Sequence, residues 1–317
     1  MEKEKTILLY ALMQYLPIAI LIALSIFFGL LYENFFSIAN LYNILRQASF
    51  LMIISMGMSF VILMGSIDAS VGAMVTLTGA IAALTVPFMG WTAIFLGILV
   101  GALLGFINGL IIVKWKIPSF LETLAMMSAL DGIALIVMKS SPINIDCKAF
   151  FNITGGSVIG NIPNLCLIPI VVVLICIYIA RRTHFGRCLY VIGANERVSH
   201  YSGINVRFTQ LMAFMTCGLL CGLAGSLEAS LFEAACPYMG RDLMMNSIAA
   251  VVIGGTQLTG GVGGPIRTIF GVILIAILGS GMNFMGLTTA SKEIATGIVM
   301  IAAVAVNMDR SRMPFVK

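Results

Sequence analysis

Long apolar runs, separated by short polar or glycine-rich breaks, follow one another along nearly the whole chain. A transmembrane helix needs about 20 mostly apolar residues. Runs near that length predict ten spans, at about residues 15–31, 44–64, 71–89, 91–113, 119–138, 164–180, 208–228, 243–258, 265–284 and 289–307. The links at 87–91 and 285–289 are very short, so nine or eleven spans also fit the pattern. We therefore predict an all-α, polytopic membrane protein of about ten transmembrane helices.

The composition excludes a water-soluble protein. Hydrophobic residues make up 60% of the 317 residues, charged residues only 10%, and the mean hydropathy is +1.07, whereas soluble domains have about 25% charged residues. The spans leave no room for a separate soluble domain, so we predict a single transmembrane domain over residues 1–317. The seven cysteines have no CxxC spacing, which argues against a disulfide framework and against a metal site.

The distribution of Lys and Arg predicts the orientation. With ten spans and the N-terminus inside, thirteen basic residues lie in inner segments and four in outer ones, with Arg46 ambiguous. Because short inner loops collect Lys and Arg, we expect both termini inside. The segment 139–163 then forms an external loop, and the polar segment 181–207 forms a cytoplasmic loop that suits a partner protein.

The cytoplasmic loop contains the signals of a short helix between Gly193 and Gly203. Asn195 is a favoured N-cap, Glu196 places negative charge in the first turn, and Gly203, after Ser202, suits a left-handed C-terminal stop. So short a helix is unstable alone in water and needs a packing partner. The loop is either an ordinary surface helix or an element that couples the membrane helices to a motor.

This chain lacks the loop that would bind nucleotide in a P-loop ATPase. The Walker A pattern needs a glycine directly before its lysine, and none of the eight lysines has one. We therefore expect no enzymatic activity and no cofactor in this chain, with ATP and magnesium bound by a partner subunit.

Three ordered blocks resemble the ribose-type (simple-sugar) permease subunits of ABC importers. They are the inner-loop residues Thr183–Arg187, Tyr190, Ile192–Glu196 and Ser202–Val206, the block Gly65–Gly72, which reads GSIDASVG, and the block Ile248–Thr256 with its following glycines. The residues Phe106–Gly109 and Lys116–Phe120 also follow the family pattern, so the resemblance covers most of the chain from about residue 40 onward.

The resemblance implies a type II ABC importer permease in the cytoplasmic (inner) membrane of a prokaryote. It implies a second permease copy, a cytoplasmic ATPase with two nucleotide sites, and an external solute-binding protein that delivers cargo. Related systems carry ribose, other pentoses, hexoses, the furanosyl autoinducer and nucleosides. The remaining partners expected are the solute and membrane lipid, with no nucleic acid.

Two glycine-rich blocks interrupt the apolar runs and predict broken helices. Their members are Gly65, Asp68 and Gly72 in the first block and Gly254, Gly255, Gly260 and Gly261 in the second. Broken helices at membrane depth occur where protein or a watery cavity satisfies the backbone, although small residues also serve plain close packing. We expect Asp68 to have a structural role, as a cap of the helix that follows it.

Polar residues within the spans are candidates for the solute path. Where the family has a threonine-rich turn and Arg-Gly, this chain has Asp131-Gly132, and Glu122 adds a second acid. A buried charge in a span costs about 2.5 to 3.5 kcal/mol, so Asp131 should face a cavity or a partner such as Arg46. Glu122 lies about half a turn out of phase with it. The further candidates, each also suited to holding helices together, are Asn108, Asn246 and Asn283.

Two other function classes fit the sequence less well than the importer. A secondary transporter of a small polar solute could share the ten spans, but it needs ion or proton sites at the midplane, and acids in the spans are few. Intramembrane hydrolysis is disfavoured because His184 and His200, the only histidines, both lie in the cytoplasmic loop.

Overall fold

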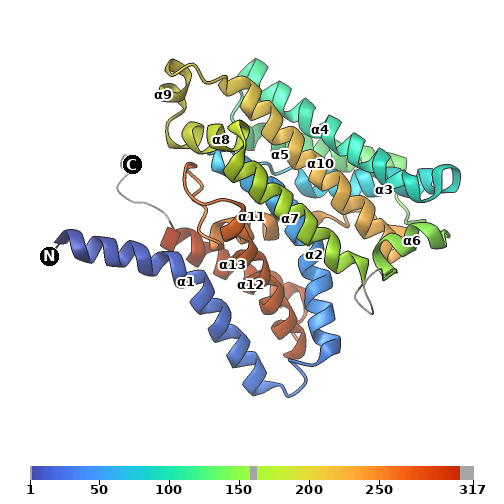
Figure 1. Ribbon diagram of the computed structural model, residues 1–317. Coiled ribbons are helices and arrows are strands. Elements are labelled where there is room, and N and C mark those ends of the chain that lie inside the picture. Colours follow the sequence, from blue (N-terminus) through green and yellow to red (C-terminus); the bar gives the residue numbers. More distant parts are fainter. Residues whose placement is uncertain (1, 158–162, 308–317) are drawn as a thin grey trace.

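The computed structural model describes residues 2–157 and 163–307, and the side chains of residues 17–157 and 163–302. Almost all of this part is helical (Figure 1). The long helices are α1 (Glu2–Leu31), α2 (Ile38–Leu63), α3 (Val71–Met89), α4 (Ala93–Trp115), α5 (Ser119–Val137), α7 (Asn164–Arg182), α10 (Val206–Phe232), α11 (Arg241–Ile253), α12 (Pro265–Phe284) and α13 (Thr289–Asn307). The short elements are η1 (Gly90–Thr92), α6 (Lys148–Gly155), α8 (His184–Ala194), α9 (Glu196–Tyr201) and the strands β1 (Ile143–Asn144) and β2 (Ala234–Ala235).

The all-α, polytopic class is confirmed, whereas the count of ten spans is not. In the described residues, six helical segments are long and apolar enough to cross a membrane. One of them is Val71–Trp115, in which α3, η1 and α4 follow one another without a gap. The span expected at 243–258 ends early, because α11 stops at Ile253. Its 13 residues cover about 20 Å at 1.5 Å per residue, too little to cross a membrane alone.

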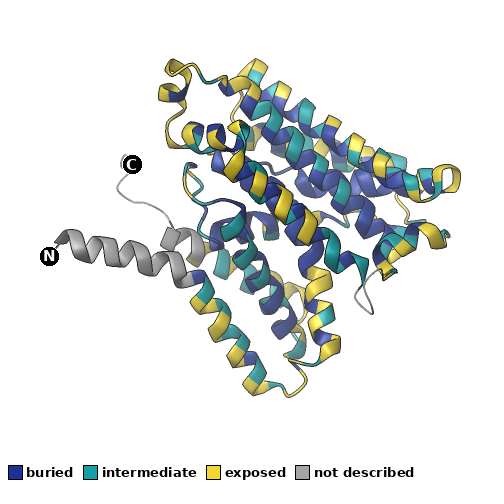
Figure 2. Ribbon diagram, viewed as in Figure 1, coloured by how far each residue is buried: buried dark blue, intermediate teal, exposed yellow. Residues whose placement is uncertain are grey.

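The helices α2 and α10 form the centre of the bundle. Every residue from 48 to 63 in α2 is buried, so this half of the helix is surrounded on all sides. Helix α10 packs against α2, α3 and α4. Few residues of the outer helices α5 and α7 are buried, and Figure 2 shows the exposed side of α7. An apolar helix buried all round marks the core of a polytopic protein, while exposed apolar faces suit contact with lipid.

Small residues bring α4 and α10 into backbone contact. A Cβ atom added at Gly101 would overlap the carbonyl oxygen of Gly218, and one added at Gly105 would overlap that of Phe214. The contact continues along four α4 glycines spaced four residues apart, namely Gly97, Gly101, Gly105 and Gly109. This is the small-xxx-small pattern of tightly packed membrane helices. The spacing of these glycines is visible in the sequence, but no helix interface was predicted from it.

The described residues of the loop that was predicted to be external are held by the end of α10. The hydroxyls of Thr154 in α6 and Ser230 in α10 are 2.9 Å apart, and Ser230 donates to the carbonyl of Phe150 at 2.7 Å. The short strands β1 and β2 pair antiparallel beside them. The loop therefore has a fixed shape where it leaves the bundle.

Candidate functional site

Helix α8 packs into the place where both glycine-rich breaks meet. The amide of Gly261 donates to the carbonyl of Leu63 at 2.9 Å, which joins the break at 254–264 to the end of α2. The hydroxyl of Tyr190 in α8 donates to the carbonyl of Gly263 at 3.0 Å. A Cβ atom at Gly193 would overlap the Leu63 carbonyl. We call these five residues the glycine junction. Burial raises the pKa of Tyr190, so the phenol stays neutral and can donate at neutral pH.

The helix predicted between Gly193 and Gly203 is α9, and its N-cap is Asn195 as expected, but the helix before it was not predicted. An additional helix, α8, precedes the predicted one, and Gly193 lies inside it as a packing residue. The remaining signals are found as expected. The side-chain oxygen of Asn195 accepts from the amide of Val198 at 3.1 Å, and Gly203 has φ of +80°. Local capping chemistry was sufficient to predict these ends.

Helix α9 is anchored at one residue and exposed at others. Ser199 is fully buried, and its hydroxyl is 2.9 Å from the carbonyl of Val191 and 2.8 Å from that of Asn195. The side chains of Val198 and Tyr201 are 56% and 90% exposed. An apolar and an aromatic side chain on an exposed polar loop suit a protein contact.

Two other predicted residues of this loop have local roles. Glu196, in the first turn of α9, accepts from Gln210 of α10 at 3.5 Å, a long contact at the surface. The hydroxyl of Ser202 donates to the carbonyl of Val198 at 2.9 Å. The first contact joins α9 to α10, whereas the second lies within the last turn of α9 itself.

The first break is held by a buried polar cluster. One carboxylate oxygen of Asp68 accepts from the amide of Ser70 at 2.9 Å and from its hydroxyl at 2.6 Å. That hydroxyl accepts from Asn108 of α4 at 2.8 Å, and Thr123 of α5 accepts from the amide of Ala69 at 3.0 Å. Asp68 thus has a structural role, but it orders the turn before α3 instead of capping a helix at Ala69, since α3 begins at Val71.

Several oxygens of this cluster have no hydrogen-bond donor within the described part of the chain. They are Oδ2 of Asp68, Oδ1 of Asn108 and both carboxylate oxygens of Glu122. Asp68 and Asn108 are fully buried, and the charges of Glu122 and Asp68 act on each other. Asn108, which we had expected in the solute path, therefore joins α4 to the break.

The solute-path candidates on α5 and α11 have surroundings that differ from our expectation. Asp131 is half-buried, and the charge that acts on it is that of Arg241 of α11, not that of Arg46, which was one of the partners considered. Arg46 acts on Cys166 of α7 instead. Asn246 is half-buried and makes no hydrogen bond through its side chain in the described part of the chain.

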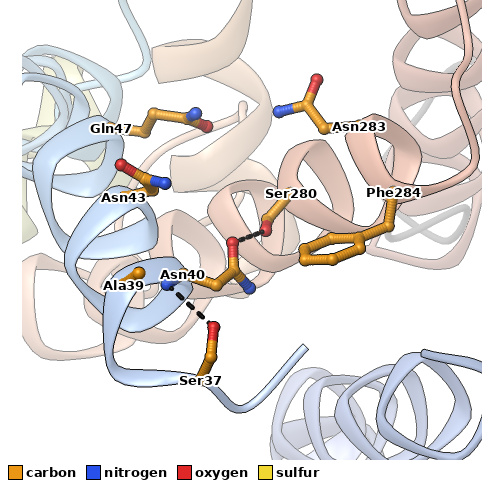
Figure 3. A pocket seen from close by; sticks show the side chains of 8 residues that line it. All are labelled: Ser37, Ala39, Asn40, Asn43, Gln47, Ser280, Asn283 and Phe284. Carbon is orange, nitrogen blue, oxygen red and sulfur yellow. Dashed lines mark hydrogen bonds between the residues drawn. The ribbon is translucent and has the colours of Figure 1, made fainter. Parts of the chain in front are cut away.

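A polar cavity of about 370 Å³ lies between the first turns of α2 and the last turns of α12 (Figure 3). Its side chains are Asn40, Asn43 and Gln47 from α2 and Ser280, Asn283 and Phe284 from α12. Of these, only Asn283 was a candidate from the sequence. The spacing of 40, 43 and 47 places three amides on one helix face, a signal in the sequence that could have found all three.

The glycines that were predicted as functional or structural lie in different parts of the fold. Gly193 and Gly261 belong to the glycine junction, Gly260 packs against Gly193 beside it, and α9 lies at the same end of the bundle (Figure 1). Gly65 approaches the carbonyl of Thr259, so the two glycine blocks touch. Two further glycines of the blocks allow close packing: a Cβ atom at Gly72 would overlap the carbonyl of Gly240, and one at Gly254 would overlap the carbonyl of Arg267. Gly255 has a φ of +95°, a backbone conformation that favours glycine.

Broken helices and a small-residue helix interface are typical of polytopic membrane transport proteins, and the sequence comparisons identify the family. The chain matches the family described as branched-chain amino acid transport system / permease component over residues 40–304. The chain belongs to this permease family.

Among curated relatives, it is similar to the ribose import permease protein of Escherichia coli strain K12, with 35% identity over 92% of both chains. The ribose import permease protein of Haemophilus influenzae is 37% identical over 90% of both chains. The D-allose transport system permease protein of Escherichia coli strain K12 is 34% identical over 90% of this chain and 88% of that one. No solved structure matches the chain.

Proposed function

We propose that this chain is the membrane-spanning permease subunit of an ATP-driven importer for a small sugar. The relatives named for ribose and allose import align over nearly their whole length. The family description names branched-chain amino acids, but these individual relatives are named for sugars. A nucleoside or the furanosyl autoinducer remains the alternative cargo, since both contain a furanose ring.

The observation that carries the proposal is the connection of α9 to the membrane helices. Helix α9 exposes Val198 and Tyr201, while its anchor Ser199 bonds to α8. Helix α8 bonds in turn to the second break through Tyr190. A push on α9 would therefore reach the start of α12 and the end of α2 through rigid contacts. The partner that pushes is a cytoplasmic ABC ATPase, which holds ATP and magnesium.

The proposed topology has about ten spans with both termini inside. Its basis is the inner excess of Lys and Arg. In Figure 1, α8, α9 and the basic ends of α4 and α7 lie at one end of the bundle, and α6 with the loop at residues 32–37 lies at the other. The assembly would contain a second permease copy and receive its solute from an external binding protein. The site of action is the inner membrane of a prokaryote.

Transport in reconstituted vesicles tests the proposal. The complex of this chain with its ATPase is placed in proteoliposomes, and uptake of labelled ribose and allose is measured with the binding protein outside and ATP inside. We expect uptake that needs hydrolysable ATP and survives a proton ionophore. Uptake that persists with a hydrolysis-deficient ATPase but collapses with the ionophore would identify a secondary transporter instead.

A further inference from the structure

The outer halves of α2 and α12 carry exposed amides where lipid-facing residues would be apolar. Asn43 and Gln47 of α2 and Asn283 of α12 are all exposed. Amide groups in contact with lipid hydrocarbon are costly, because nothing there replaces their hydrogen bonds to water. This face is therefore in contact with water, with a ligand or with polar protein.

Some polar groups of the cavity are hydrogen-bonded within the protein, and others remain able to bind a ligand. Asn40 accepts from Ser280 at 2.9 Å and donates to the carbonyl of Phe35 at 2.7 Å, so it joins α2 to α12. Asn43 and Gln47 make no hydrogen bond through their side chains within the described part of the chain. Asn283 accepts from Lys292, which leaves its amide NH₂ group unused. Figure 3 shows Gln47 and Asn283 on the two facing helices, above the bond between Asn40 and Ser280.

We propose that this cavity binds a neutral polyhydroxylated solute, such as a sugar, on the outer side of the translocation path. Amides offer donors and acceptors side by side, as hydroxyl groups require. The ring of Phe284, which is held by Tyr32 and Phe35, adds an apolar surface. The volume of about 370 Å³ is in the range of small-molecule sites. This inference rests on the proposed function.

A charge lies beside the cavity. None of the described residues that line the cavity is itself charged, but the ammonium group of Lys292 donates to the side-chain oxygen of Asn283. This group is a further donor that the hydroxyl oxygens of a neutral polyol can use together with the amides.

The first test removes both free amides of α2. In the complete complex in proteoliposomes, Asn43→Ala with Gln47→Ala should raise the apparent KM for the sugar by about tenfold or more, because two hydrogen bonds to the solute are lost. Stimulation of ATP hydrolysis by the loaded binding protein should persist. The matched control is Asn34→Ala, an exposed amide of the outer loop that does not line the cavity, and it should leave the KM unchanged.

A second measurement serves if the double variant does not assemble. Gln47→Cys, with Cys147 and the exposed Cys236 replaced by serine, is labelled with a membrane-impermeant maleimide. Sugar delivered by the binding protein should slow the labelling. An unchanged KM in a double variant that assembles would overturn the inference. If that variant does not assemble, labelling of Gln47→Cys that sugar does not slow would overturn it. In both cases, ATP-dependent sugar uptake by the wild type would still support the proposed function. Absence of ATP-dependent sugar uptake by the wild type overturns both.

Discussion

At Gly101 a single hydrogen atom takes the place of a side chain because the backbone of α10 lies directly against it. Association of helices at such positions depends on close packing, because lipid tails are as apolar as the helices and burial of apolar surface therefore gives little driving force for helix association. Gly132 of α5 has a different environment, with no neighbouring heavy atom within 4 Å of an added Cβ. The same residue type therefore has opposite sensitivity at the two sites.

We predict that Gly101→Ala lowers the free energy of unfolding by about 1 to 3 kcal/mol, the usual cost of overpacking. Gly132→Ala should leave it unchanged or slightly higher, since alanine favours helix. Thermal unfolding of the two purified variants in detergent measures the difference. Equal midpoints would mean that α4 and α10 are not in backbone contact.

We predict that Asp131→Asn lowers solute uptake while the complex still assembles. The substitution keeps the shape of the side chain but removes the charge that acts on Arg241, so the local field in this part of α5 changes. Uptake kinetics and co-purification of the ATPase are the measurements. The wild-type rate and KM would assign Asp131 to helix packing.

At the scale of elements, α8 and α9 differ in what holds them. Helix α8 is held by close contacts at the glycine junction, whereas α9 has six residues and depends on its caps and on Ser199. A helix that short has little stability of its own. The orientation of α9 is thus the least stable part of the proposed connection between the ATPase and α12.

We predict that Asn195→Ala with Gly203→Val uncouples ATP hydrolysis from uptake before it affects insertion. Loss of the cap costs about 1 kcal/mol. Valine at Gly203 has room but opposes the φ of +80°. The ATPase activity of the reconstituted complex, with and without the loaded binding protein, is compared with uptake.

The matched control is Gly286→Val, between α12 and α13. Gly286 has φ of +67° and nothing within 4 Å of an added Cβ, so the local backbone strain is alike. It should leave coupling intact. Normal stimulation and uptake in the double variant would exclude α9 as the coupling element.

For the whole molecule, two distant ends have different chemistry. One end has the glycine junction and α9, and the other has the amide cavity and α6 (Figure 1). Helices α2 and α12 reach both, because α2 ends at Leu63 in the junction and begins beside the cavity. A movement of the junction therefore acts on helices that also form the cavity.

We predict that a cysteine at position 152 is labelled by an impermeant reagent from outside intact cells, whereas one at position 201 is not. Asn152 and Tyr201 are both exposed in the fold. Ser199, which a sequence-based choice would favour, is fully buried and unsuitable. The background chain needs serine at Cys147 and Cys236. Labelling at 201 but not at 152 would reverse the proposed orientation.

Sequence alone determined the class of the protein and most helix positions. A bilayer leaves no alternative to helices for apolar runs of this length, so composition and run length were sufficient. Caps are equally local, and Asn195 and Gly203 were predicted correctly because their hydrogen bonds and φ depend on residues within one turn. The break after Leu63 and the one before Pro265 followed from glycine content in the same way.

Tertiary structure decided which distant residues meet. Gly193 precedes the predicted loop helix as expected, but its role as a packing residue could not be predicted, because only the folded chain brings the Leu63 carbonyl to it. The charge that acts on Asp131 is that of Arg241, a residue far along the chain, because helix packing decides which distant charges come near one another. The amide cavity needed both α2 and α12 in place. Contacts between helices depend on rotation and crossing, which hydrophobic periodicity leaves open when a helix is apolar all round.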